Sequence, residues 1–173
     1  MSKILLHTCC APCTTYVNKW LAAHDFEVKG FFYNPNIRPQ EEYERRLLTM
    51  EHYATVAGLK VVYEPRDIQT ELGDCENCYR VRLKKTAQFA NENGFDCFST
   101  TLLISPYQKH DLLKIVGEQV SSECGVEFFC QDFRQGFRES QQTAREMNLY
   151  RQKHCGCGAD LIVKEEKVYA QAG

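Results

Sequence analysis

Short apolar runs alternate with amphipathic stretches along most of the chain. Runs of apolar side chains bounded by turn residues predict strands at 3–7, 26–33, 59–63, 97–103 and 126–130. Between these runs, apolar residues recur three and four positions apart. This spacing predicts helices at 14–24, 41–57, 78–93, 109–124, 139–148 and 159–170. Gly58, Gly94 and Gly125 follow three of these helices, as glycines often do at helix ends.

The alternation of strands and helices predicts the fold class. It is typical of an α/β protein, here a Rossmann-like (HUP-like), mostly parallel sheet of four to five strands with helices on both faces. We expect residues 1–173 to form a single domain, with a C-terminal helical segment at 134–173. In such sheets the functional site lies beyond the carboxyl ends of the strands, so we expect a metal site there.

Composition indicates which compartment and which kind of chemistry to expect. The 173 residues contain no apolar run near the ~20 residues that a membrane helix needs, and the N-terminus turns polar at once. We therefore expect a cytoplasmic protein without membrane partners, in which thiols stay reduced. Ten cysteines in that compartment indicate metal binding or catalysis. A net charge of -2 excludes a bulk electrostatic attraction to nucleic acid but allows a local basic face.

Seven of the ten cysteines fall into three tight groups. They are Cys9, Cys10 and Cys13 directly after the first predicted strand, then Cys75 with Cys78, then Cys155 with Cys157. Topology places the first two groups at the edge of the sheet that the carboxyl ends of the strands form, and the third group can reach the same edge. Convergent thiolates bind soft metal ions or iron–sulfur clusters, and four of them suit zinc and [4Fe–4S] equally on ligand count.

The internal spacing of the groups adds further chemistry. Cys10-Ala11-Pro12-Cys13 is similar to the thioredoxin redox motif, but that interpretation leaves the other groups without a role. In Cys155-Gly156-Cys157 the glycine allows the two sulfurs to approach, either as metal ligands or as a strained, reducible disulfide. For Cys97, Cys124 and Cys130, which lie in apolar surroundings, we predict core packing.

Basic and acidic side chains near the cysteines are candidates for substrate contacts. Arginines in three basic stretches predict a surface for an anionic substrate such as tRNA; we select Arg45, Arg80, Arg134 and Arg151. Asp74, Tyr107 and His154 are candidate proton donors, whereas for His7 we favour a structural role. No glycine-rich phosphate-binding motif is present in the sequence.

Several segments together resemble one known family, the cobalamin-independent epoxyqueuosine reductases of the QueH type. The matching segments are Leu5 to Cys13 (LLHTCCAPC), Phe32 to Ile37 (FYNPNI), Glu42 to Arg46 (EYERR), Cys75 to Tyr79 (CENCY), Phe98 to Tyr107 (FSTTLLISPY) and Tyr150 to Gln152 with Cys155 to Cys157 (YRQ, CGC). The resemblance covers nearly the whole chain. One departure is His154, where many relatives have an aromatic residue.

The resemblance implies an oxidoreductase for the last step of queuosine biosynthesis. Such an enzyme reduces epoxyqueuosine at the wobble position of the tRNA anticodon loop to queuosine, with electrons from a separate donor. It implies a [4Fe–4S] cluster on Cys9, Cys10, Cys75 and Cys78. It also implies a redox-active pair, Cys155 and Cys157, or an additional iron ion bound by that pair or by Cys13.

Two other functions are compatible with the cysteine pattern. One is a thiol–disulfide oxidoreductase that uses Cys10 and Cys13 and needs no metal. The other is a zinc-stabilised tRNA-binding module without catalytic activity. Metal analysis separates the three hypotheses, since they predict iron, no metal and zinc respectively.

Overall fold

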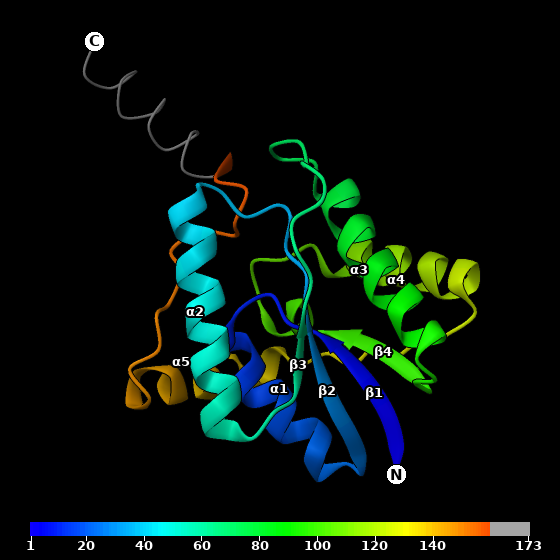
Figure 1. Cartoon of the computed structure of the whole chain (residues 1–173), viewed down its shortest axis with the longest axis horizontal. Coiled ribbons are helices and arrows are strands. Elements are labelled where there is room, and N and C mark those ends of the chain that lie inside the picture. The colour runs from blue at the N-terminus through cyan, green and yellow to red at the C-terminus, as the bar shows by residue number, and fades with distance from the viewer. Residues whose placement is uncertain (160–173) are drawn as a thin grey trace.

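The centre of the protein is a parallel β-sheet. We describe residues 1–159 from a computed structural model of the chain (Figure 1). Five strands pair in the order β3-β2-β1-β4-β5, and every pair is parallel. They are β1 (Ser2–His7), β2 (Phe26–Phe32), β3 (Val61–Tyr63), β4 (Cys97–Thr100) and β5 (Glu127–Phe128). The predicted α/β fold class is confirmed.

Helices cover both faces of this sheet. The α-helices are α1 (Ala11–Ala23), α2 (Gln40–Ala57), α3 (Cys75–Glu92), α4 (His110–Cys124) and α5 (Phe137–Glu146), and two short 3-10 helices are η1 (Thr101–Ile104) and η2 (Arg134–Gly136). Helices α1, α2 and α5 lie on one side of the strands, and α3 and α4 lie on the other (Figure 1). No helix in the described part of the chain has the length and hydrophobicity that crossing a bilayer requires.

The central strand explains why the core forms where it does. Ile4, Leu5 and Leu6 on β1 are completely buried, because helices pack against both of its faces. A continuous apolar run is what a parallel strand covered on two sides requires. Leu83 on α3 and Val17 on α1 join the same hydrophobic cluster, so one core spans the sheet.

Several elements differ from their predicted bounds. Strand β4 ends at Thr100 rather than at residue 103, because the Thr100 hydroxyl accepts a hydrogen bond from Leu102 N (3.1 Å) and starts η1. Helix α3 begins at Cys75, three residues earlier than predicted, because the Asp74 carboxylate accepts a hydrogen bond from Asn77 N (2.9 Å) and caps the helix. The predicted helix at 159–170 falls outside the described residues except for its first position.

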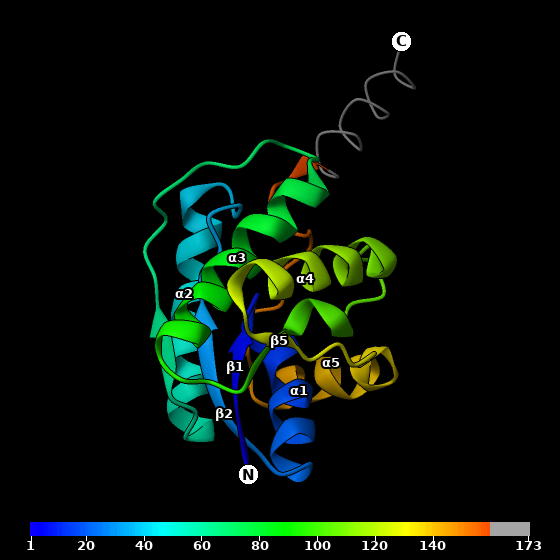
Figure 2. The same cartoon turned by 90° about the vertical axis from the view of Figure 1, so that its right-hand side faces the viewer.

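The strand order brings separate parts of the chain to one edge. The chain leaves β1 toward β2 and later returns to add β4 on the other side of β1. The first cysteine group follows β1 at this switch point. The segment after α5 then runs back along α2 to the same edge, near the start of α3 (Figures 1 and 2).

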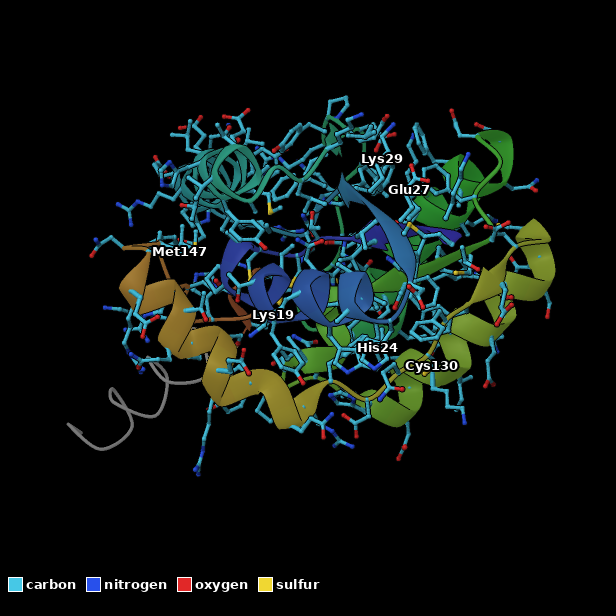
Figure 3. The ribbon with its side chains drawn as sticks, turned by 90° about the horizontal axis from the view of Figure 1, so that it is seen from below. Lys19, His24, Glu27, Lys29, Cys130 and Met147 are labelled. Carbon is cyan, nitrogen blue, oxygen red and sulfur yellow. The ribbon has the colours of Figure 1, made fainter. Side chains whose placement is uncertain are left out.

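The three cysteines predicted to pack in the core have different environments. Cys97 on β4 is buried, as predicted, and Cys124 at the end of α4 is half-buried. For Cys130 the prediction is wrong, because its side chain is exposed. Strand β5 ends at Phe128, so Cys130 lies in the irregular segment that follows, on the lower side of the molecule (Figure 3).

A glycine inside α4 gives a test of the packing. A Cβ atom added to Gly117 would lie 2.1 Å from Cε1 of the buried Phe128 ring. Alanine in a helix gains up to about 1 kcal/mol over glycine, whereas overpacking a core costs about 1–3 kcal/mol. We expect Gly117→Ala to lower the free energy of unfolding, measured by urea denaturation, by about 1–2 kcal/mol.

The control is Ser122→Ala, an exposed position on the same helix, which should change the free energy of unfolding by no more than about 0.5 kcal/mol. An equally or more stable Gly117→Ala protein would contradict this packing.

Candidate metal and redox site

The first cysteine group is a buried cluster of three thiols. The Sγ atoms of Cys9, Cys10 and Cys13 all lie within 4.8 Å of one another, and those of Cys9 and Cys10 are 3.8 Å apart. Thr101, the residue after β4, fixes this cluster, since its hydroxyl accepts a hydrogen bond from Cys9 N (2.9 Å) and donates one to Cys9 Sγ (3.1 Å). The cluster is therefore held between the ends of two adjacent strands.

The three thiols differ in acidity. Hydrogen bonds from Cys10 and Cys13 lower the pKa of the Cys9 thiol well below its usual range. Burial raises the pKa of Cys10 to about 12. Cys9 is thus the most acidic thiol of the group, and it lies beside the N-terminus of α1, where unpaired N–H groups favour negative charge.

His7 has the structural role that we predicted for it. Burial lowers the pKa of His7 to about 4, so the imidazole is neutral at pH 7. Its Nε2 lies 3.1 Å from Tyr33 O, which can only accept, so Nε2 carries the proton. Nδ1 then accepts a hydrogen bond from the Thr100 hydroxyl (2.9 Å). The ring joins the ends of β1, β2 and β4, two residues before Cys9.

The second and third cysteine groups share one small cavity. Cys75 and Cys78 lie in the first turn of α3, and the cavity between them and the third group has a volume of about 30 Å³, the room of a water molecule or an ion. Its lining includes Asn36, Asp74, Tyr79, Arg82, Gln108, Cys155 and Cys157. The Sγ atoms of Cys155 and Cys157 are 3.7 Å apart, so the two thiols are adjacent but not joined as a disulfide.

A buried ion pair on α2 holds the segment that carries the third cysteine group in place. Arg46 Nε donates to Glu42 Oε1 (2.8 Å), and Arg46 Nη2 donates to the carbonyl oxygen of His154 (2.9 Å). Glu42 Oε2 accepts a hydrogen bond from the Tyr150 hydroxyl (2.6 Å). Burial disfavours the charge on Glu42, but hydrogen bonds from Tyr150 and Arg46 outweigh it and hold the pKa of Glu42 below its usual range. Both charges are satisfied by the segment that carries Cys155.

The glycine of the third group is required by its surroundings. Gly156 has φ +127°, and a Cβ atom added to it would lie 2.9 Å from Asn36 Nδ2. Its carbonyl oxygen accepts a hydrogen bond from Arg38 N (2.8 Å). The loop between β2 and α2 therefore contacts the Cys-Gly-Cys turn directly.

Two side chains link the three groups into one site. Gln152 Nε2 donates to Cys10 Sγ (2.9 Å), which ties the third group to the first. Arg82 Nη2 donates to Cys78 Sγ (3.2 Å), and the Arg82 charge also helps to lower the pKa of His7 after the larger effect of burial. The second and third groups thus line one cavity, and Gln152 connects the segment of the third group to the first.

The sulfur spacings fit metal binding. Two thiolates about 2.3 Å from one tetrahedral ion lie about 3.8 Å from each other. The separations in the Cys9–Cys10 pair (3.8 Å) and the Cys155–Cys157 pair (3.7 Å) match this value. The Cys9, Cys10 and Cys13 cluster could therefore hold a single metal ion.

The three candidate proton donors lie in different places. Asp74 lines the cysteine cavity and caps α3 through one carboxylate oxygen. Tyr107 is 84% exposed, packs edge-on against the Phe137 ring and is not among the residues that line the cavity. His154 is nearly buried, with Nε2 4.0 Å from Glu42 Oε1.

The four candidate substrate arginines also differ. Arg80 forms an ion pair with Glu123, and Arg134 Nη2 donates to Asp132 Oδ2 (2.6 Å). Arg45 lies over the Tyr150 ring, 5.8 Å from its centroid, and Arg151 is exposed. Two of the four thus carry a charge that a carboxylate already balances.

Several side chains of the site were not selected from the sequence. Asn36 is 1% exposed, lines the cysteine cavity and has an Oδ1 atom without a hydrogen-bond partner among the described residues. Arg82 and Gln152 were not selected either, although both donate to cysteine sulfur. Gln152 and Asn36 stand inside the motifs that carry the family resemblance, which was the one signal that could have identified them.

Comparison with known proteins identifies the family of the chain. A family model described as epoxyqueuosine reductase QueH matches residues 4–159, which include all three cysteine groups. The chain belongs to the epoxyqueuosine reductase QueH family. The QueH of Dehalococcoides mccartyi is 37% identical over 164 residues, 90% of each chain. The QueH of Thermotoga maritima is 35% identical, over 96% of this chain and 94% of the relative.

A solved structure supports the fold. A predicted subunit of tRNA methyltransferase from Methanocaldococcus jannaschii superposes with a TM-score of 0.53 at 11% identity, covering 84% of this chain and 75% of that one. At this identity the similarity concerns the fold alone. The Rossmann-like sheet expected for a QueH protein is thus also found in a protein of distant sequence.

The buried ion pair on α2 leads to a stability prediction. Replacing Arg46 by methionine leaves the Glu42 charge buried without its partner, and breaking such a pair costs about 3–5 kcal/mol. We expect Arg46→Met to lower the free energy of unfolding of the reduced protein by that amount, measured by urea denaturation. The double variant Glu42→Gln/Arg46→Met should recover part of the loss, because the uncompensated charge is gone.

The matched control is Arg45→Met, one residue earlier on the exposed side of α2. Its effect should be about 0.5 kcal/mol or less. If Arg46→Met were no more destabilising than Arg45→Met, the ion pair would not be what holds the third cysteine group.

Proposed function

We propose that this chain is an iron–sulfur dependent reductase that converts epoxyqueuosine to queuosine in the anticodon wobble position of tRNA, the last step of queuosine biosynthesis. The curated relatives are named epoxyqueuosine reductase. The observation that supports the proposal is the cavity shared by the second and third cysteine groups, together with the hydrogen bond from Gln152 to Cys10 of the first group. A reductase needs electron-transferring groups at its substrate site, and clustered thiolates are ligands for such groups.

The reaction defines what the site must supply. Both carbon–oxygen bonds of the epoxide break, a carbon–carbon double bond forms, and the oxygen leaves as water. The balance requires two electrons and two protons for each epoxide. The electrons come from an external reductant, and the protons come from acidic side chains or water at the site.

We assign Cys9, Cys10, Cys75 and Cys78 as ligands of a [4Fe–4S] cluster. Four thiolates form its usual ligand set, and here two come from each of two helix starts. A bound cluster would supply electrons one at a time. The N-termini of α1 and α3 and the Arg82 guanidinium would stabilise the negative charge of these thiolates.

We assign Cys155 and Cys157 to a second iron ion. Their 3.7 Å separation fits two thiolates on one ion, whereas a disulfide would require the sulfurs to approach to about 2.05 Å. Iron held there would act as a Lewis acid toward the departing oxygen. Cys13, which was also considered for this ion, lies with Cys9 and Cys10 instead.

Side chains around the cavity would act on the substrate. The Asp74 carboxyl lines the cavity beside Cys75 and is the proton donor that we favour over the exposed Tyr107. Asn36 lines the same cavity, and its unpartnered Oδ1 would accept a hydrogen bond from a donor group bound there. The Tyr79 hydroxyl donates a hydrogen bond to Gln108 Oε1 (2.6 Å), and both side chains line the cavity.

The partners follow from the reaction. The substrate is the tRNA anticodon loop that bears epoxyqueuosine, and Arg45 and Arg151 are the selected arginines that we retain for its phosphates. A separate electron donor is needed for turnover. The reaction belongs in the cytoplasm, where thiols stay reduced.

The assignment predicts which cysteines are needed for activity. With anaerobically purified protein, a reductant and tRNA bearing epoxyqueuosine, we expect conversion to queuosine, measured by nucleoside mass spectrometry. Cys155→Ser should lower the rate by at least about tenfold, because changes to the groups around a metal commonly cost about 10- to 100-fold in activity. The control Cys130→Ser removes an exposed thiol on the lower side of the molecule and should keep the wild-type rate (Figure 3). Equal rates for wild type and Cys155→Ser would remove this pair from the reaction.

Metal content distinguishes this function from the two alternatives. We expect iron and acid-labile sulfide in the wild-type protein, visible absorbance that dithionite bleaches, and loss of both activity and absorbance after chelation. Cys78→Ser should lose the cluster absorbance. Full activity in metal-free protein would instead favour a thiol–disulfide oxidoreductase, and a colourless, zinc-containing protein would favour a binding module.

A further inference from the structure

A second, larger cavity adjoins the cysteine site. Its volume is about 550 Å³, within the range of sites that bind small organic ligands, whereas the cavity between the second and third cysteine groups has a volume of about 30 Å³. The residues that line the larger cavity are Pro35, Arg38, Arg66, Asp67, Ile68 and Gln69. None of them was selected from the sequence as a substrate-binding residue.

The two cavities share a wall. Asn36 lines the cysteine cavity, while Pro35 and Arg38 on either side of it line the larger one. Arg38 N also donates a hydrogen bond to the carbonyl oxygen of Gly156 (2.8 Å), between the two cysteines of the third group. A ligand with two connected parts can therefore place one part at each cavity.

The larger cavity carries two guanidinium groups. Arg66 Nη1 donates to Ile37 O (3.0 Å), and its guanidinium carbon lies 4.1 Å from the centroid of the Tyr43 ring. These two contacts fix the plane of the group and leave its other N–H donors for a ligand. Within residues 1–159, Arg38 and Arg66 form no salt bridge with a carboxylate.

The one carboxylate of the cavity is already engaged. Asp67 Oδ1 accepts a hydrogen bond from the Tyr33 hydroxyl (2.5 Å), and Asp67 Oδ2 lies 3.5 Å from Lys85 Nζ. The hydrogen bond from Tyr33 holds the pKa of Asp67 below its usual range, so it remains an acceptor. The cavity thus combines cations, a hydroxyl acceptor and the exposed apolar side chain of Ile68.

We propose that this cavity binds the sugar-phosphate and base of a nucleotide next to the modified nucleoside, an inference that rests on the proposed function. Arg38 and Arg66 contact the phosphate, as guanidinium groups do at nucleic-acid backbones. Asp67 or Gln69 accepts a hydrogen bond from the ribose 2′-hydroxyl, and the base lies against Ile68. The shared wall sets the distance between this nucleotide and the reacting one.

The test measures RNA binding and turnover separately. The iron-loaded protein is titrated, without oxygen, into a fluorescently labelled anticodon stem-loop RNA that lacks the epoxide, and the dissociation constant is read from anisotropy at several salt concentrations. We expect Arg38→Gln to weaken binding at least about fivefold and to reduce the slope of log Kd against log salt by about 0.7, the value for one contact with single-stranded RNA. With tRNA bearing epoxyqueuosine, KM should rise by a similar factor while kcat stays within about twofold.

Two further variants keep the test decisive. Arg66→Lys keeps the charge but loses the planar contact with Tyr43, so we expect weaker binding with an unchanged salt slope. The matched control is Arg145→Gln, an exposed arginine two residues before Met147, which lies at the end of α5 (Figure 3); it should bind as wild type does.

The outcomes separate this cavity from the proposed function. Wild-type turnover with unchanged binding, salt slope and KM in both Arg38→Gln and Arg66→Lys would overturn the nucleotide site and leave the reductase. Wild-type protein that binds RNA through Arg38 but does not reduce epoxyqueuosine would support the site and reject the reductase.

Discussion

The buried pair of Glu42 and Arg46 is the interaction on which the site depends. Cys155 and Cys157 come from a segment that follows α5, on the lower side of the molecule, and this segment must cross beside α2 to reach the strand ends. Arg46 donates to the backbone of that segment and Glu42 accepts from Tyr150, so the two buried charges are satisfied by the chain that they hold. Because buried charges are costly when unpaired, the pair favours one position of the segment over others.

The remaining cysteines are placed by helix starts rather than by a local binding loop. Cys9 and Cys10 precede α1 and lie at the point where the strand order reverses, and Cys75 and Cys78 form the first turn of α3. Both helix starts present unpaired N–H groups, which favour thiolate. Arg82 adds a positive charge at Cys78. An anionic inorganic centre is therefore compatible with the surroundings of its ligands. In the neighbouring cavity, Arg38 and Arg66 would likewise stabilise the negative charge of an anionic substrate.

The sequence predicted the layers of the fold and the identity of the clustered cysteines, because strand periodicity and cysteine spacing are local signals. It did not predict the start of α3, although Asp74 was available as a cap. It also missed the buried pair on α2: a charged helix is expected to face water, and burial depends on a partner segment more than a hundred residues away. Cys130 was assigned to the core because its neighbours are apolar, but β5 ends two residues before it. Arg66 belongs to no motif, and only its stacking on Tyr43 reveals it.

The central claim is that sulfurs from distant parts of the chain hold one inorganic centre. The most direct measurement is a crystal structure of anaerobically purified protein with anomalous diffraction recorded at the iron absorption edge. The account predicts one compact group of iron atoms bonded to sulfur atoms of both the Cys9–Cys10 and the Cys75–Cys78 pairs. Iron bound to only one of these pairs, or no iron between them, would contradict it.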